Sequence, residues 1–169
     1  MLRWALYAAA GLALLALLGL AAGRLGLWAG QPPGDLGVRE GRLKAPSANP
    51  NSVSSQAALW PGHAQLAYAS IAPLAVAVAV AGDAAAAMAK VRSVVESTPG
   101  ARVLQADAGY LRAEFTTPLM RYTDDVEFWF DSAAGVVQVR SASRLGEGDL
   151  GVNRARIEML RARLATPAS

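Results

Sequence analysis

The side chains of this chain that could bind or transform a ligand are concentrated between Arg140 and Arg154. This stretch reads R-S-A-S-R-L-G-E-G-D-L-G-V-N-R and lies between an apolar strand pattern and a helical pattern. Arginine presents a planar fork of donors that suits phosphates and carboxylates, and hydroxyls and backbone amides near glycines add neutral donors. We therefore expect an anion-accepting patch here. Its candidate binding residues are Arg140, Ser141, Ser143, Arg144, Asp149, Asn153 and Arg154.

Three carboxylates, Asp124, Asp125 and Glu127, precede the arginine-rich stretch and are its possible partners. Together with Asp149 they suggest a hard cation such as Ca²⁺, which takes about 6–8 oxygen ligands. Acids interleaved with arginines form ion-pair ladders more often than metal sites, so we predict no metal and no cofactor. We assign no catalytic residue. A hydrolase-like enzyme with Asp125 or Glu127 as general base is the alternative function.

The glycines of the stretch also spell a dinucleotide-binding pattern, Gly146–Gly151. In that interpretation Glu147 and Asp149 would place negative charge where a pyrophosphate must sit, so we reject it. A tight turn explains the glycines with fewer assumptions, and Asp149 or Asn153 would then cap the following helix.

An antiparallel sheet would position these side chains. Alternating apolar and polar residues predict strands, at about residues 74–81, 103–106, 110–116, 125–130 and 136–143. The sequence D-S-A-A-G, which begins at Asp131, reads as a hairpin turn between the last two. Pairing Asp131 with the first residue after this turn places Glu127 opposite Arg140 and Asp125 diagonal to Arg144. We expect Glu127 to hold Arg140 and leave Arg144, at the end of the strand, to serve a ligand.

Two helices complete the expected domain. Asp83 is the N-cap of the first, which ends at Pro99-Gly100. The second runs from about Val152 to Leu164, with an apolar stripe between flanking arginines whose stems cover its edges. The predicted fold class is α+β: an antiparallel sheet of about five strands with two helices, behind one N-terminal transmembrane helix.

The transmembrane prediction rests on Trp4 to Ala22, a leucine- and alanine-rich run without a charge. A helix needs about 20 such residues to cross the hydrocarbon core. The competing interpretation is a signal peptide cleaved near Ala21 and Gly23, but its apolar region usually runs about 7–15 residues. We favour a retained anchor over cleavage.

The predicted domain boundaries follow from the anchor. It occupies residues 1–28, a tether rich in Pro, Gly and Ser with ordered loops occupies 29–62, the globular domain spans 63–165, and 166–169 form a disordered tail. Arg3 favours an inside N-terminus, whereas Arg24 and later basic residues oppose export. We expect a single-pass protein of the cytoplasmic (inner) membrane whose soluble domain faces the periplasm or outside.

Several segments resemble the uncharacterised family catalogued as domain of unknown function 1499. They are Asp35–Leu43, Asn49–Gln56, Asp124–Asp131, Arg140–Arg144 and Asp149–Glu158. The resemblance implies a small envelope or plastid-lumen domain, often behind a membrane anchor, with no established activity. It also implies a cysteine pair where this chain has Ser47 and Ser52. The chain has no cysteine, so it performs no thiol chemistry.

The net charge of the chain indicates which classes of partner to expect. A net charge of +3 is far smaller than the basic footprint of most nucleic-acid-binding domains, so we expect no nucleic acid. The expected partners are the membrane, through Trp4–Ala22, and an anionic small molecule, a lipid headgroup or a protein. We favour a binding or interaction module over an enzyme. A third interpretation stays open, in which Arg140–Arg154 only joins the last strand to the last helix.

Overall fold

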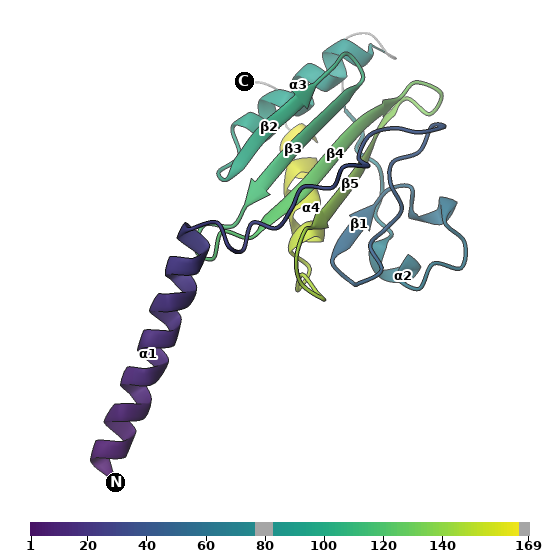
Figure 1. Cartoon of the computed structure of the whole chain (residues 1–169). Coiled ribbons are helices and arrows are strands. Elements are labelled where there is room, and N and C mark those ends of the chain that lie inside the picture. Colours follow the sequence, from purple (N-terminus) through teal and green to yellow (C-terminus); the bar gives the residue numbers. More distant parts are fainter. Residues whose placement is uncertain (77–82, 166–169) are drawn as a thin grey trace.

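The computed structural model describes residues 1–76 and 83–165. An apolar helix, α1 (Leu2–Arg24), stands apart from an α+β domain and meets it only at the helix's C-terminal end (Figure 1). By length and composition α1 is able to cross a membrane, and a signal sequence near an N-terminus passes the same test. Trp28 folds back on the helix, its Nε1 donating to the Gly19 carbonyl at 3.0 Å.

The domain is built on one antiparallel sheet with the order β1-β5-β4-β3-β2. Its strands are β1 (Ser52–Ser54), β2 (Ala101–Ala106), β3 (Tyr110–Thr116), β4 (Thr123–Asp131) and β5 (Val136–Ser143). Strands β2 to β5 form a meander in which neighbours in sequence are neighbours in space. The short strand β1 is added to the outer edge of β5, where it covers backbone groups that an edge would leave unpaired.

The predicted register of the β4–β5 hairpin is confirmed. Asp131 pairs with Val136, Phe128 with Val139 and Glu127 with Arg140. The turn is stabilised because Asp131 Oδ1 accepts hydrogen bonds from the backbone of Ala133 and Ala134, each at 3.1 Å.

Two helices cover one face of the sheet, α3 (Ala84–Glu96) and α4 (Val152–Ala165) (Figure 1). Asp83 caps α3 as predicted, accepting from the Ala86 amide at 2.9 Å. The stripe of Ile157, Leu160 and Leu164 on α4 is buried against apolar side chains of the sheet, with Phe128 at the centre of that core. The α+β class, the antiparallel sheet and the two covering helices are therefore confirmed. A short helix, α2 (Leu66–Ala69), and a 3₁₀ turn at Ala57–Leu59 were not predicted.

The fifth strand differs from the prediction. Within the described residues, the predicted strand at 74–81 contributes only an isolated bridge between Leu74 and Val137, and its positions 77–81 lie outside the described residues. The fifth strand is instead Ser52–Ser54. Its three residues are too few to show an alternating pattern, and pairing with β5 holds them extended.

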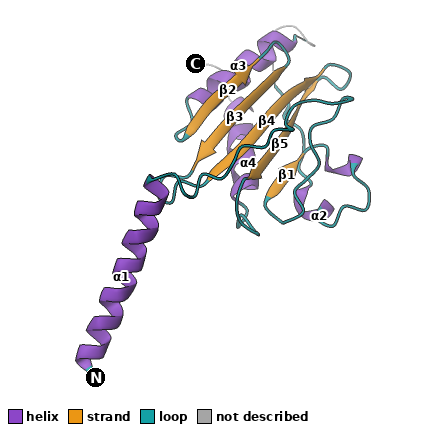
Figure 2. Cartoon of the chain, viewed as in Figure 1, coloured by secondary structure: helices purple, strands orange, loops and turns teal. Residues whose placement is uncertain are grey.

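The other face of the sheet lies beneath residues 29–50, which we call the strap. Figure 2 shows the strap as an extended loop that crosses the sheet on the side away from α3 and α4. Leu43 is buried, and its amide donates to Gln56 Oε1 at 2.8 Å. The strap therefore forms a third layer over a face that would otherwise be open to solvent.

Candidate functional site

The face of the sheet beneath the strap is charged. Because side chains alternate along a strand, it carries Arg112 and Glu114 from β3, Asp125 and Glu127 from β4, and Arg140 from β5. Asp125, Glu127 and Arg140 are 1%, 0% and 3% exposed. Burying a charge is costly unless it is paired and hydrogen-bonded, so the contacts of each group decide whether it is available to a ligand.

Arg144 is held between two carboxylates. Its Nε and Nη2 donate to the two oxygens of Asp125 at 2.7 and 2.9 Å, and Nη2 also donates to Glu114. Asp125 accepts a further bond from Arg112 at 3.1 Å. The hydrogen bonds to Asp125, above all, raise the pKa of Arg144. Burial raises the pKa of Glu114, but hydrogen bonds from Arg144 and Arg102 outweigh it and hold that pKa below its ordinary value. The contacts thus place Arg144 in an ion-pair ladder, in contrast to the free donor that we expected.

Glu127 and Arg140 are opposite each other but joined less tightly. Glu127 Oε1 accepts from the Gly37 amide of the strap at 2.7 Å and from the Tyr110 hydroxyl at 2.8 Å. Its Oε2 has no hydrogen-bond partner in the described part of the chain and lies 3.8 Å from Arg140 Nη1. Burial, followed by the charge of Glu127, raises the pKa of Tyr110, so its hydroxyl stays protonated and donates.

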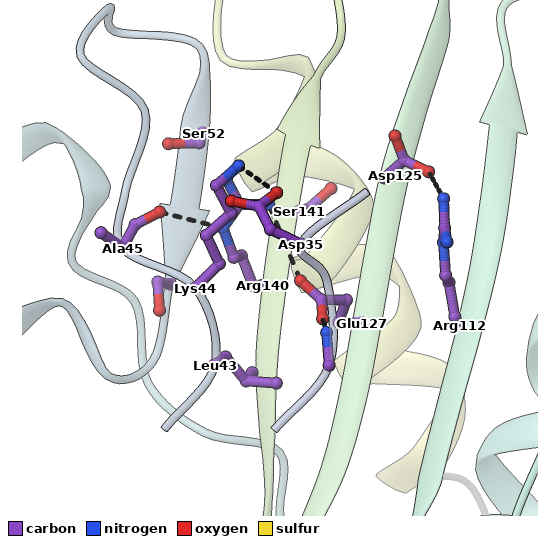
Figure 3. A network of polar contacts seen from close by, with 12 residues as sticks. Asp35, Leu43, Lys44, Ala45, Ser52, Arg112, Asp125, Glu127, Arg140 and Ser141 are labelled. Carbon is purple, nitrogen blue, oxygen red and sulfur yellow. Dashed lines mark hydrogen bonds and ion pairs between the residues drawn. The ribbon is translucent and has the colours of Figure 1, made fainter. Parts of the chain in front are cut away.

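Arg140 is a buried charge with few hydrogen bonds. Its Nε donates to the carbonyl of Ala45 in the strap at 3.2 Å, and no other hydrogen bond from its guanidinium occurs among residues 1–76 and 83–165 (Figure 3). Burial lowers its pKa, opposed first by the charge of Glu127 and then by that of Asp125. The Nη groups of Arg140 therefore retain donor capacity.

A cavity of about 320 Å³ adjoins Arg140 between the strap and the sheet. One wall of the cavity is the part of the strap around Lys44, and the other is formed by residues of β4 and β5 and by Arg144. Lys44 Nζ contacts Asp35 at 2.6 Å (Figure 3). The lining residues are Gln31, Pro33, Lys44, Pro46, Ser47, Ala48, Asp125, Arg140, Ala142, Ser143 and Arg144. We call this space the strap cavity.

The remaining predicted residues lie mainly on the opposite face, against α4. Ser141 Oγ donates to Asn153 Oδ1 at 2.5 Å, and Asn153 Nδ2 donates to Ser143 Oγ at 3.0 Å. Arg156 joins this group through Ser141, Asn153 and Asp124. These bonds connect β4, β5 and α4, so the polar groups on this side are occupied in holding the domain together.

Asp149 caps α4, which confirms the predicted capping role. Its Oδ1 accepts from the Gly151 amide at 3.0 Å and its Oδ2 from the Asn153 amide at 2.9 Å. Tyr68 also donates to Asp149. Burial raises the pKa of Asp149, and the bonds from Tyr68 and Asn153 more than reverse that effect, so the net shift is downward. Arg154 donates to the carbonyls of Tyr68 and Ser70 at 2.5 and 2.9 Å, which ties α4 to the α2 region.

The candidate residues thus divide between two faces. Arg140 and Arg144 lie under the strap with Asp125 and Glu127, whereas Ser141, Asn153, Asp149 and Asp124 face α4. Within the described residues, no group of three histidine or acidic side chains comes together as metal ligands.

Sequence reasoning missed Lys44, Gly37, Tyr110 and Arg156 as parts of these networks. Tyr110 could have been found, because it alternates onto the same face as Arg112. Lys44 and Gly37 lie in a loop without periodicity, so no local signal places them over the sheet. Arg156 was recognised only as a flanking arginine of the last helix, and its contact with Asp124 depends on how that helix packs.

The family comparison agrees with the resemblance drawn from the motifs. A family model described as a protein of unknown function (DUF1499) matches residues 42–164, which includes every strand and both covering helices apart from the last residue of α4. No curated protein matches the chain.

Proposed function

Since the chain belongs to this family of proteins of unknown function, DUF1499, we propose a role from its own geometry: a membrane-anchored module that binds a small oxyanion in the strap cavity. The oxyanion is a carboxylate or a phosphate. The observation that carries the proposal is Arg140, a buried guanidinium that lines the cavity and donates one hydrogen bond within the described chain. Its remaining guanidinium donors can form charge-assisted hydrogen bonds to an oxyanion in the cavity.

The charge balance of the site supports an anion. The ion pairs of this face and of the strap above it join five basic side chains to four carboxylates, so five minus four leaves one positive charge. The members are Arg102, Arg112, Arg140, Arg144 and Lys44 with Asp35, Glu114, Asp125 and Glu127. Arg144 and Arg112 are both paired with the buried Asp125, whereas the carboxylate that pairs with Lys44, Asp35, is itself half-exposed. We therefore assign ligand binding to Arg140 and to Lys44, whose ion pair with Asp35 is open to exchange with a ligand.

The alternative of a hydrolase-like enzyme has less support. Both oxygens of Asp125 accept hydrogen bonds from arginines, so neither is available to take a proton. Glu127 retains one oxygen without a hydrogen bond, but its side chain is fully buried beneath the strap. A general base must come within hydrogen-bond reach of the proton that it abstracts. Asp125 lines the strap cavity with both oxygens held by arginines, and Glu127 is buried, so neither is well placed for this role.

The proposal includes the position of the domain. We infer that α1 is retained as an anchor in the cytoplasmic membrane, with the domain on its outer side. Retention is supported by the contacts at the end of α1, because Gly23 packs against the backbone of Met120 and cleavage there would remove this contact. Trp28 and Tyr122 lie with ring centroids 6.1 Å apart at the same end, and such rings favour the membrane–water interface.

Thermal unfolding of the purified full chain in detergent tests the binding proposal. Inorganic phosphate, succinate and glycerol 3-phosphate are each titrated, and at least one is expected to raise the melting temperature. A ligand at 100 times its Kd stabilises a protein by about 2.7 kcal/mol.

Lys44→Gln is the informative variant, since Lys44 is partly exposed and its loss leaves only an exposed carboxylate unpaired. This variant should fold normally and lose most of the oxyanion-dependent rise. Arg92→Gln, on an exposed part of α3, is the matched control and should retain the rise. A rise that survives in Lys44→Gln, or no rise with any of the three anions, contradicts binding in the strap cavity.

A further inference from the structure

Exposed apolar side chains gather at the end of the domain from which α1 leaves. Leu119 and Tyr122 come from the β3–β4 loop, and Leu145, Leu150 and Val152 come from the β5–α4 connection and the first residue of α4. We call these five residues the membrane-proximal patch. Soluble domains rarely expose a contiguous apolar group of this kind without an interaction that uses it.

Close contacts connect the two loops to each other and to α1. Met120 contacts Gly23 of α1, and Tyr122 lies against Trp28, just beyond that helix. Tyr122, Leu145, Leu150 and Val152 line one open groove of about 320 Å³. In Figure 1 the β5–α4 loop extends below the sheet on the side where α1 joins the domain. The patch is therefore continuous with the anchor.

Leu150 is the most conspicuous member of the patch. It is fully exposed, and its φ of 51° lies in the left-handed region that favours glycine. Asp149 maintains this geometry through its bonds to the backbone of Gly151 and Asn153. A strained backbone that displays a leucine to solvent is unfavourable for folding alone, so the strain indicates a role outside the folded domain.

Charges around the patch suit a lipid surface. Arg24 at the end of α1 and Arg121 between Leu119 and Tyr122 are exposed, against one exposed acid, Glu147. An apolar group with basic residues at its edge is the pattern of proteins that lie in the headgroup region of a bilayer.

We propose that the membrane-proximal patch docks on the surface of the bilayer that α1 crosses. This inference rests on the retained anchor of the proposed function. Leu150, Leu119 and Leu145 enter the headgroup region, while Arg24 and Arg121 contact lipid phosphates. Docking holds the domain in one orientation beside its anchor. It also places the strap cavity, whose lining begins only a few residues beyond α1 at Gln31, close to the membrane surface.

Depth-dependent fluorescence quenching of the full chain in lipid vesicles tests the proposal. The chain has no native cysteine, so a single environment-sensitive label is placed at Leu150→Cys, at Ala133→Cys or at Leu14→Cys. Ala133 is an exposed residue of the β4–β5 turn, at the far end of the sheet, and Leu14 is in the middle of α1. The vesicles contain phosphatidylglycerol and phosphatidylcholine with a nitroxide either in the headgroup region or deep in the acyl chain.

The expected result is strong headgroup quenching of the Leu150 label, deep quenching of the Leu14 label and little quenching of the Ala133 label. If the Leu14 label is quenched but the Leu150 label behaves like the Ala133 label, the anchor stands and the docking is refuted. If the Leu14 label is not quenched, the anchor fails and the docking fails with it. A Leu150 label that is protected from aqueous iodide yet not quenched by lipid would mean that protein covers the patch, which also refutes the docking.

A second pair of variants separates docking from folding. With the label at Val152→Cys, the additional change Leu150→Asn should reduce headgroup quenching severalfold, since asparagine tolerates a left-handed backbone but adds no apolar surface. The melting temperature of the domain should not fall. Quenching that is unchanged by Leu150→Asn contradicts the role of this leucine in docking.

Discussion

Phe128 and Trp129 are neighbours in β4 whose side chains leave opposite faces of the sheet. Phe128 is fully buried among the side chains of α3, α4 and the sheet, whereas Trp129 is half-buried on the strap side near Gly41. Truncating each residue to alanine removes an aromatic ring from one face of the sheet, so the two substitutions compare how much each layer contributes to stability.

Phe128→Ala is expected to lower the free energy of unfolding by about 3–5 kcal/mol, the range for a buried aromatic truncated to alanine. Trp129→Ala should cost less, because its ring already meets solvent at the edge of the strap. Urea denaturation of the full chain, followed by circular dichroism, gives both values. An equal or larger loss for Trp129→Ala would mean that the strap face contributes as much as the helix face.

From the sequence we expected Arg140 to be paired and Arg144 to be free for a ligand, but in the structure Arg144 is paired and Arg140 retains donors. Arg144→Ala would leave Asp125 and Glu114 without their main partner, and breaking one side of a buried pair costs about 3–5 kcal/mol. We therefore expect Arg144→Ala to destabilise the ligand-free domain strongly, while Arg140→Ala leaves a single carboxylate, Glu127, whose Oε1 is still hydrogen-bonded. Denaturation curves of the two variants compare their losses of unfolding free energy. An Arg144→Ala variant as stable as the wild type would contradict the ion-pair ladder.

The ion pairs of Glu114 with Arg144 and Arg102 should also make stability depend on pH. The folded pKa of Glu114 lies below its ordinary value, so its contribution is complete above the unfolded pKa of about 4.3 and is lost as the pH falls toward the folded pKa. Glu114→Gln should flatten the stability profile below about pH 4.3. A profile identical to that of the wild type would show that Glu114 is not stabilised by Arg144 and Arg102.

At the scale of elements, the strap is the segment on which the candidate site depends. It supplies Ala45 and Lys44 to the cavity and Gly37 to Glu127, yet it contains no helix and no long strand. Its end is held to β1 where the Ser47 amide donates to Ser52 Oγ at 2.8 Å. These are the positions at which the family resemblance implies a cysteine pair.

The double substitution Ser47→Cys/Ser52→Cys should therefore form a disulfide under air oxidation and raise the melting temperature reversibly with the redox state. The gain in unfolding free energy should be at or below about 2 kcal/mol, because closing a short loop removes little conformational entropy from the unfolded chain. Thiol titration and melting with and without reductant measure it, and Ser47→Cys alone is the control. Free thiols in the oxidised double variant would indicate that the two Cβ atoms point apart.

At the scale of the whole molecule, the position of the domain relative to the membrane determines which ligands can reach it. α1 meets the domain through Gly23, Trp28 and the β3–β4 loop. These contacts fix the end of the domain from which α1 leaves. Under the proposed anchoring, this end faces the membrane and the orientation of α1 determines the compartment.

Expressed in a bacterial host, the full chain should fractionate with membranes and resist an alkaline wash, because a helix of about 20 apolar residues spans the hydrocarbon core. The Ala133→Cys variant should react with a membrane-impermeant maleimide in intact spheroplasts. Reaction only after lysis would place the domain inside the cell, and release by alkali would show that α1 does not span the membrane.

Those parts of the protein that depend on local patterns could be predicted from the amino-acid sequence. The β4–β5 register, the cap at Asp83, the apolar stripe of α4 and the family all follow from alternation, turn residues and short motifs. Three features became visible only in the folded chain: β1 completes the sheet, the strap covers its charged face, and Arg144 is occupied while Arg140 retains donors. The physical reason is that these features depend on side chains far apart in the chain, such as Gly37 with Glu127, whose meeting no local periodicity encodes.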